Sequence, residues 1–499
     1  MTVERSSPPP ISAHIVLRRR LVTAACMMAI FMAAVEVTIV ATAMPTIVAE
    51  LGGARFFSWV FAAYLLTQAV TTPLYGRLAD IYGRKPVFVA GTSLFLLGSA
   101  ACGFTWSMAS LVVFRIVQGL GAGCIQSVAT TIIGDVYGGS DRARVQGWLS
   151  GVWAFAAIIG PLLGAFIVQH LHWALVFWIN LPIGAVTIWL LCVFLTEDFD
   201  RREHQIDWLG SLLLMLGLGA IMTVMVQAQI LGTSIAVLLM GAGFGALAWL
   251  VVQERRAQEP VIPVALLRNR IIAIGNVGSL VIGALLMCVV GFLPTYVQAV
   301  MGRSAAVAGA VVATLSVAWS CGSIAAGRAM ATTSYRSTGA AGALALLAGT
   351  ALLTTLNPHN GVLAMTIGAL LVGIGMGVCN IVFLLVVQGS VAWSERGIAT
   401  ASTLFTRTIG QTIGAGLAGA ILNFGLSRYA PDAIEALDLL LDANRRQSLD
   451  PQQVAQMVEA VAGSLHDVYL VAALLAMVTL AAALLLPAGL GPKSSDAAE

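Results

Sequence analysis

The sequence has 499 residues, of which 59% are hydrophobic and only 10% are charged. Soluble globular domains carry about 25% charged residues, so the composition excludes an ordinary soluble protein and predicts an all-α polytopic membrane protein. The net charge of +3 is small, and nothing in the sequence resembles a nucleic-acid-binding surface, so we expect no nucleic-acid partner.

The first apolar run covers residues 21–49 and follows a polar, proline-rich tail at residues 1–20. It is long enough to span a bilayer and lacks the small-residue cleavage site of a signal peptide. Glu36 lies near its middle, where an ionised carboxylate costs roughly 2.5–3.5 kcal/mol on insertion scales. We interpret Glu36 as a proton carrier in a transporter. The alternative is a neutral Glu36 that binds a neighbouring helix and only holds the bundle together.

Further apolar runs bring the predicted number of membrane spans to fourteen. After the first, they lie near residues 57–78, 86–106, 108–137, 145–170, 173–196, 208–229, 232–253, 271–300, 304–330, 338–356, 361–388, 397–424 and 467–487. We divide the chain into two six-helix bundles joined by an inserted pair and polar linkers: 21–196, linker 197–207, pair 208–253, linker 254–270 and 271–487. The excess of Arg and Lys on one side predicts that the tails at 1–20 and 488–499 are both cytoplasmic.

The two six-helix bundles repeat each other. Each has a proline late in its first span, a Gly-Arg pair after its second span and three alternating glycines in its fourth span. In chain order these are Pro45, Gly76–Arg77, and Gly119, Gly121 and Gly123, then Pro294, Gly327–Arg328, and Gly373, Gly375 and Gly377. Related halves joined by an inserted pair are typical of a transporter with a substrate site at the midplane and an alternating-access cycle.

The loop after the second span reads GRLADIYGRK, residues 76–85. Gly76 and Gly83 have no side chain and permit a tight turn and close helix approach, while Asp80 can accept hydrogen bonds from Arg or from backbone N–H groups. Asp135, at the end of the fourth span, is the expected partner of Arg84. We interpret the cluster as a conformational latch. A simple anchor of positive charge is the alternative, but it leaves the acid unexplained.

Several other features have a weaker interpretation. The seven cysteines all lie in apolar runs without metal-ligand spacing, so we interpret them as packing residues. The outer segment 425–466 is expected to form two amphipathic helices that start near Pro431 and Pro451 and act as a gate or as a connector. Aromatic and amide side chains expected to line the substrate cavity are Tyr64, Gln68, Gln126, Trp153, Asn276 and Asn380.

Together these motifs support a resemblance to a known family. GRLADIYGRK resembles the cytoplasmic loop signature of the major facilitator superfamily, and other segments resemble its fourteen-helix drug:proton antiporter family. LVVFRIVQGLGAG, residues 111–123, resembles the helix-four motif that places Arg115 in the membrane. IIGPLLGAF, residues 158–166, resembles the antiporter motif of helix five, with Gly160, Pro161 and Gly164. EVTIVATAMP, residues 36–45, resembles the helix-one motif, with Glu36 where many members have Asp.

The resemblance implies that Glu36 carries the coupling proton, that Arg115 tunes it, and that Gly160, Pro161 and Gly164 form a seam favouring antiport. The position of Arg115 is consistent with this role. At 1.5 Å per residue it lies within roughly two helical turns of the outer end of its span, and its side chain can reach toward the depth of Glu36. Burial disfavours the charged form of a carboxyl group and a nearby guanidinium favours it, so such a pair can load and unload a proton. The alternative for Arg115 is a structural bond to backbone carbonyls.

The expected function is therefore proton-coupled, multidrug-type efflux of amphipathic or cationic compounds across the cell membrane, with consequences for antibiotic resistance. We expect a monomer in the lipid bilayer that uses the proton gradient and no cofactor. Export of a dedicated lipid, peptide or metabolite, or import of a solute, are alternatives with the same fold. A membrane sensor or enzyme has little support, because the sequence shows no nucleotide-binding loop, metal-ligand cluster or catalytic triad.

Overall fold

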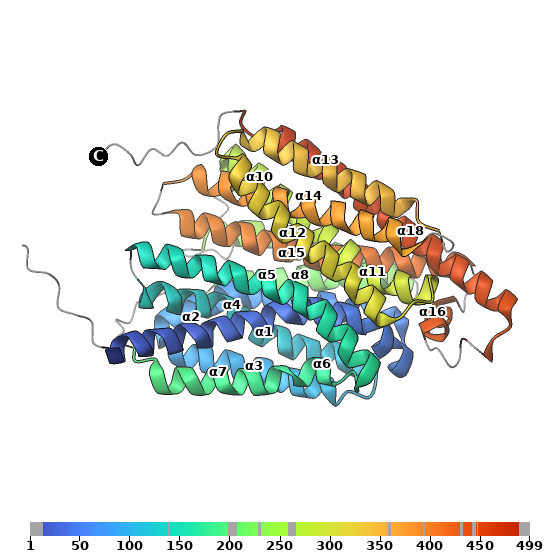
Figure 1. Cartoon of the computed structure of the whole chain (residues 1–499), viewed down its shortest axis with the longest axis horizontal. Helices are drawn as coiled ribbons and strands as arrows, with labels where there is room; N and C mark the ends of the chain where they lie inside the picture. Colours follow the sequence, from blue (N-terminus) through green and yellow to red (C-terminus); the bar gives the residue numbers. More distant parts are fainter. Residues whose placement is uncertain are drawn as a thin grey trace, which may run out of the picture.

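The computed structural model describes residues 13–137, 139–197, 207–227, 231–257, 266–357, 361–392, 395–429, 433–441, 446 and 448–488. Over these residues the chain is almost entirely helical (Figure 1). Most of the first predicted linker and of both predicted tails, at 198–206, 1–12 and 489–499, lies outside the described residues, as does part of the second linker, at 258–265. The same holds for 430–432, 442–445 and 447 of the predicted outer segment, which include Pro431.

Two helical bundles and an inserted helix pair make up the described chain. The first bundle contains α1 (Ala13–Leu51), η1 (Ala54–Phe56), α2 (Phe57–Tyr82), α3 (Arg84–Gly103), α4 (Met108–Val136), α5 (Gly139–His170), α6 (Leu175–Trp178) and α7 (Asn180–Phe194). The inserted pair is α8 (Trp208–Gln227) and α9 (Thr233–Glu254), followed by η2 (Leu266–Arg268). The second bundle contains α10 (Arg270–Val290), α11 (Leu293–Thr295), η3 (Tyr296–Val300), α12 (Ala305–Ala329), α13 (Tyr335–Thr354), α14 (Val362–Gly389), α15 (Arg396–Tyr429), α16 (Ala433–Leu441) and α18 (Pro451–Leu484).

The predicted membrane architecture is confirmed. Thirteen stretches of the described chain are helical, long and apolar enough to cross a bilayer. Helix α2, with 26 residues, is less apolar but packs between α4 of its own bundle and α15 of the other. Counting α2, the described residues contain fourteen long helical spans, in agreement with the sequence.

The alternating glycines show that the repeat is structural. In each bundle the outer two glycines face one neighbouring helix and the middle glycine faces another, so that the fourth span is held between them. In α4, Gly119 and Gly123 face α2 and Gly121 faces α3. In α14, Gly373 and Gly377 face α12 and Gly375 faces α13. A Cβ atom at any of these positions would lie 2.0–2.5 Å from a neighbouring atom, so glycine is required for the close approach.

Two predicted boundaries differ from the structure. Helix α1 begins at Ala13, eight residues before the predicted start of the first span at Leu21. The end of the expected N-terminal tail is therefore part of this helix. The second predicted surface helix does start at Pro451, but it is not separate, because α18 runs without a break into the last span. The reason is that no proline lies between Pro451 and the end of α18 at Leu484, and the buried side chains of Val461, Leu465 and Val468 continue one apolar face. The short helix α16 lies where the first was expected.

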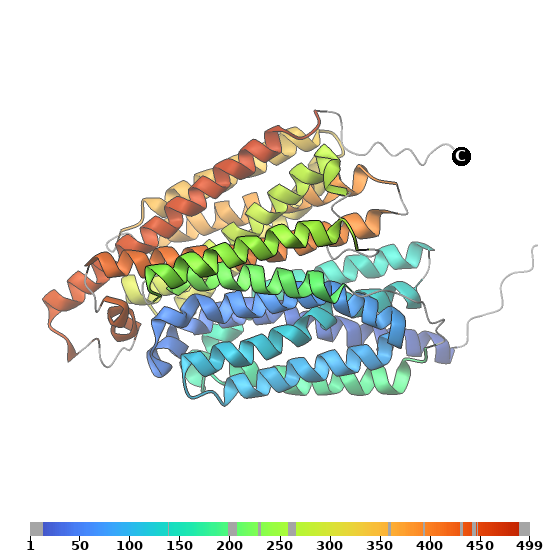
Figure 2. The same ribbon diagram turned by 180° about the vertical axis from the view of Figure 1, so that it is seen from behind.

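The two bundles are in close contact at the end of the molecule that carries η1 and α16, here called the α16 end (Figures 1 and 2). A Cβ atom on Gly419 of α15 would lie 1.9 Å from Ser58 Oγ at the start of α2. The rings of Phe57 and Phe292 are 5.2 Å apart. Separation of the bundles at this end therefore requires both backbone and ring contacts to break.

Helix α16 adds a polar bond to this closure. The Asp438 carboxylate accepts hydrogen bonds from the backbone N–H groups of Gly53, at 3.0 Å, and Ala54, at 3.1 Å. Gly53 has φ = +78°, a conformation that glycine adopts without strain and that turns these N–H groups toward one acceptor. Leu437 and Leu440 are buried on the same helix. Helix α16, in the connection from α15 to α18, thus binds the first bundle.

Removal of the Asp438 carboxylate is expected to favour opening at the α16 end. A hydrogen bond to a charged group contributes about 1.5–3 kcal/mol, so Asp438→Ala should increase the open population by at least about tenfold. The measurement is the alkylation rate of a cysteine introduced as Ser58→Cys, which lies in the seam. Asp450→Asn is the matched control, because Asp450 is exposed and its side chain makes no capping bond to α18. Equal rates in both variants would contradict a role for Asp438 in closure.

The inserted pair lies over the seam between the bundles. Helix α8 packs against both α2 and α15, and Asn423 of α15 donates a 3.1 Å hydrogen bond to the carbonyl oxygen of Val226. A Cβ atom on Gly416 would lie 2.4 Å from Met222 Cε. Helix α9 packs mainly on α8 and leaves most of its own apolar side chains exposed.

Candidate functional site

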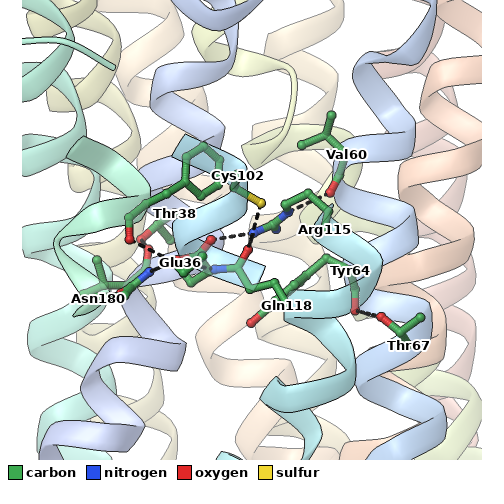
Figure 3. Close-up of polar contacts among 12 residues, drawn as sticks. Glu36, Thr38, Val60, Tyr64, Thr67, Cys102, Arg115, Gln118 and Asn180 are labelled. Atoms are coloured by element: carbon green, nitrogen blue, oxygen red, sulfur yellow. Dashed lines mark hydrogen bonds and ion pairs between the residues drawn. The ribbon is translucent and has the colours of Figure 1, made fainter. Parts of the chain in front are cut away.

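The buried acid of the first span is paired with a buried base. Arg115 of α4 lies with its NH1 atom 2.5 Å from Glu36 Oε1 of α1 (Figure 3). The two side chains are 1% and 0% exposed. The Arg115 Nε also donates to the carbonyl oxygen of Val60, at 3.1 Å. Arg115 therefore forms an ion pair with Glu36 and also makes the bond to a backbone carbonyl that its structural alternative predicts.

Uncharged polar side chains complete the hydrogen bonding of this pair. Asn180 Nδ2 donates to Glu36 Oε2 at 2.7 Å, and Gln118 Oε1 accepts from Arg115 NH1 at 2.7 Å. Ser99 Oγ accepts from Asn180 at 3.0 Å and from Gln118 at 3.1 Å, which closes the network. Both carboxylate oxygens of Glu36 thus have a donor, and helices α1, α3, α4 and α7 each contribute a side chain.

An aromatic ring covers the base. The guanidinium carbon of Arg115 lies 4.0 Å from the centroid of the Tyr64 ring, a distance typical of a cation–π contact. Tyr64 was expected to line the substrate cavity, but its side chain is only 1% exposed. It belongs instead to the wall of the Glu36 site, because it lies on the face of α2 that packs on α4 rather than on an accessible face.

The free energy of this site is finely balanced. Removing two charges from water costs several kcal/mol per ion, which the pair recovers only through close contact and complete hydrogen bonding. Glu36 and Arg115 have both. A proton on Glu36 would neutralise the carboxylate and leave the guanidinium without its counter-charge. The arrangement can therefore convert a protonation event into a change in the contacts of α1, α2 and α4.

The sequence did not single out Ser99, Gln118 or Asn180. Gln118 could have been found, because it lies three residues after Arg115 and so on the same helix face. Asn180 is a polar residue between two apolar runs, FWI and LPIG, which is a weaker signal. Nothing in the sequence distinguishes Ser99 from other small polar residues in the spans.

The predicted latch residues come together at the turn between α2 and α3. Arg84 Nε lies 2.6 Å from Asp135 Oδ2, and Arg84 NH2 lies 3.3 Å from Asp80 Oδ1. The expected pairing of Arg84 with Asp135 is confirmed. Gly83 has φ = +97°, so the tight turn requires a glycine there. A Cβ atom on Gly76 would meet nothing within 4 Å, so the expected close approach at Gly76 is wrong.

Glu197, which follows α7, is a further member of this cluster. Its carboxylate accepts hydrogen bonds from the backbone N–H groups of Arg84 and, at 3.1 Å, of Lys85. These are the first residues of α3, where the helix dipole favours a negative charge. Lys85 Nζ in turn donates to the carbonyl oxygen of Leu195 at 3.0 Å. The end of α7 is thereby tied to the start of α3.

Asp80→Asn is expected to slow transport while leaving substrate affinity and protein stability nearly unchanged. Asp80 and Asp135 are 34% and 52% exposed, and exposed ion pairs contribute only about 0.2–1 kcal/mol to stability. The measurement compares the transport rate of one compound with the affinity of the detergent-solubilised protein for the same compound. A large loss of affinity with unchanged cycling would refute the latch.

The predicted antiporter seam on α5 faces one helix of its own bundle and one helix of the other. A Cβ atom on Gly160 would lie 2.1 Å from Thr38 Oγ1, and one on Gly164 would lie 2.9 Å from the carbonyl oxygen of Ile39. On another side of α5, the carbonyl oxygen of Pro161 lies 2.6 Å from the position of a Cβ on Gly309. Helix α5 therefore packs closely on α1 and on α12 of the second bundle.

The remaining cavity candidates divide into two groups. Gln68, Gln126 and Trp153 are half-buried in the first bundle. Asn276 and Asn380 lie in the second bundle and each contacts α15: Asn276 Nδ2 donates to Ser402 Oγ at 3.1 Å, and Asn380 Oδ1 accepts from Arg407 NH1 at 3.1 Å.

Comparison with known proteins agrees with this architecture. The model of the family described as Major Facilitator Superfamily matches residues 26–415. The chain is 30% identical over 440 residues to Multidrug resistance protein 3 of Bacillus subtilis (strain 168), covering 86% of this chain and 85% of that protein. It is 33% identical over 419 residues to Multidrug transporter protein MdtP of the same organism, covering 81% and 76%. A solved bacterial homologue of the human lysosomal transporter Spinster, in an inward-facing and unoccupied conformation, has a TM-score of 0.66 at 14% identity over 95% of this chain and 98% of that chain.

Proposed function

Because the chain belongs to the Major Facilitator Superfamily, a family of membrane transporters, we propose that it is a proton-coupled antiporter that exports amphipathic, drug-like compounds by alternating access. The printed names of two relatives, a multidrug resistance protein and a multidrug transporter, support this substrate class. The proposal includes a monomer in the cell membrane, with both termini in the cytoplasm and the proton gradient as the source of energy.

The observation that carries the proposal is the buried pair of Glu36 and Arg115. An acid in the middle of a span is expensive to keep and is retained where it moves or senses charge. Glu36 has no exposed surface, so it cannot bind cargo directly in this conformation. Coupling must therefore act through the helices: α1 contacts α5 and α12, and α2 contacts α15, so a changed network at Glu36 alters contacts with the second bundle.

The direct test uses purified protein in vesicles with an imposed pH gradient. Ethidium, a fluorescent amphipathic cation, and rhodamine B, an amphipathic dye with a carboxylate, are the probes. We expect accumulation against the dye gradient, proton movement in the opposite direction, and loss of both on addition of a protonophore. Dye accumulation that does not depend on the pH gradient, or proton movement in the same direction as the dye, would refute proton antiport.

A further inference from the structure

We propose that Arg407 and Asn380 form a subsite for the negatively charged group of the cargo, so that amphipathic acids and zwitterions are preferred substrates. The inference rests on the proposed transport function and narrows its substrate class. Arg407 belongs to α15 and Asn380 to α14, both in the second bundle. Their contact is the 3.1 Å hydrogen bond from Arg407 NH1 to Asn380 Oδ1.

Arg407 lies too deep in the bundle to reach water at the membrane surface by extending its side chain. It is eleven residues after the start of α15 at Arg396, which corresponds to about 16 Å along the helix axis. Half of a 30 Å hydrocarbon layer is about 15 Å, so Arg407 lies near the midplane. The backbone is also held there, because a Cβ on Gly283 of α10 would lie 2.1 Å from the Arg407 carbonyl oxygen.

The hydrogen bonding of this guanidinium is incomplete. Its Nε is buried and has no hydrogen-bond partner, and Asn380 provides an amide oxygen rather than a charge. A guanidinium offers five N–H donors in a planar fork that matches a carboxylate or phosphate. Arg115, in the first bundle, has a carboxylate, an amide oxygen, a backbone carbonyl and an aromatic ring around it.

The second bundle has no acid that could neutralise Arg407 inside the membrane. From residue 271 to 487, every Asp and Glu is either Glu395 or lies in the segment 432–467. Glu395 precedes Arg407 by twelve residues, about 18 Å along a helix. In the other described spans every acid except Glu36 lies within two residues of a helix end, and the Glu36 carboxylate already binds Arg115 and Asn180. The counter-charge for Arg407 must therefore come from outside the chain.

A neighbouring polar group extends the subsite. Asn276 of α10 donates to Ser402 of α15, and its Oδ1 is buried without a hydrogen-bond partner. Ser402 and Arg407 lie on the same helix, about 7.5 Å apart along its axis. The subsite thus offers a cation for the charged group of a cargo and an unoccupied acceptor for a donor on the same molecule.

A matched pair of dyes tests the proposal. Rhodamine B carries a free carboxylate, and its ethyl ester differs only in that group. Binding of each dye to the full-length protein in nanodiscs of zwitterionic lipid is measured by fluorescence anisotropy, without a pH gradient. We expect the wild type to bind the acid about tenfold more tightly than the ester, as a charge-assisted hydrogen bond predicts.

Variants of Arg407 separate this role from a structural one. Arg407→Gln is expected to lose the preference for the acid while binding the ester as before, and Arg407→Lys should keep part of the preference. Arg396→Gln is the matched control, since it removes the same charge from an exposed position on the same helix. A wild type that binds neither dye or binds both equally, or an Arg407→Gln variant that still prefers the acid, would overturn the proposal.

Two further experiments, with anionic lipid and with inorganic phosphate, test whether the anion at Arg407 comes from a source other than the cargo. If a lipid phosphate or inorganic phosphate occupies the subsite, anionic lipid in the nanodisc or added phosphate will abolish the preference for the acid, and assignment to the cargo is then wrong. Because binding is measured without a gradient, a protein that shows the dye preference but no proton-driven accumulation would refute the antiport proposal alone.

Discussion

Glu36→Gln is expected to abolish accumulation of substrate driven by a pH gradient. Glutamine has nearly the shape of a protonated glutamate but cannot release a proton, so the cycle loses its coupling. Proton and substrate affect each other's binding reciprocally. If the cargo favours the ionised form of Glu36, wild-type binding tightens as pH rises and the variant shows a flat pH dependence.

The measurement compares two modes of the same vesicles. Exchange of substrate across the membrane without a gradient can persist in Glu36→Gln, whereas net accumulation against the substrate gradient should not. Glu36→Asp is the matched variant and should keep partial activity, because the titrating group remains and only its reach is shorter. A glutamine variant that still concentrates substrate at the wild-type rate would show that Glu36 is structural.

The structure adds a requirement that the sequence did not suggest. From the sequence alone, Glu36→Gln is cheap, because a neutral amide is easier to bury than a charge. In the structure the same change removes the carboxylate bound to Arg115 at 2.5 Å and leaves a buried guanidinium with uncharged partners. Some loss of stability is therefore expected, and transport must be normalised to folded protein.

Arg115→Met is expected to have the largest effect on stability. Removing one partner of a buried ion pair typically costs about 3–5 kcal/mol, since the other charge stays behind. The double variant Glu36→Gln/Arg115→Met should recover much of this loss, because no charge then remains in the site. Thermal unfolding of the purified variants in detergent is the measurement.

Arg84→Met provides the comparison for the buried pair. It also breaks ion pairs, but its partners Asp80 and Asp135 are partly exposed, so the change should be within about 1 kcal/mol. If Arg115→Met were as mild as Arg84→Met, or if the double variant were no more stable than Arg115→Met, the charges at the centre of the first bundle would not depend on each other.

The sequence predicted those parts of the site that follow from the depth of charged residues within the spans and from the turns between spans. Glu36 and Arg115 are charges in apolar runs, and the long Arg115 side chain can reach toward the depth of Glu36, so their pairing follows from the span boundaries. The turn at Gly83 and the pair of Arg84 with Asp135 follow in the same way, because both ends lie on one side of the predicted membrane.

Other parts depend on the rotation of helices, which apolar sequence does not specify. Spans that are hydrophobic all round have no clear inner face, so the sequence does not reveal that Tyr64 packs on Arg115 of α4. Asn180 and Glu197 join the site through contacts between segments distant in sequence. The sequence does not distinguish Arg407, because its span also contains many Thr, Ser and Gln residues.

The position of α8 makes the two sides of the transporter unequal. In a pair of related bundles, two seams run from the centre toward the lipid, one between α2 and α15 and one between α5 and α12. Helix α8 packs on both α2 and α15, and α9 packs on α8, so the first seam is shielded from lipid by the inserted pair. If a cargo enters from the bilayer, we expect it to use the α5–α12 seam. The two bundles are related to each other, but the inserted pair covers one of their two seams. The transporter therefore presents two different sides to the surrounding lipid.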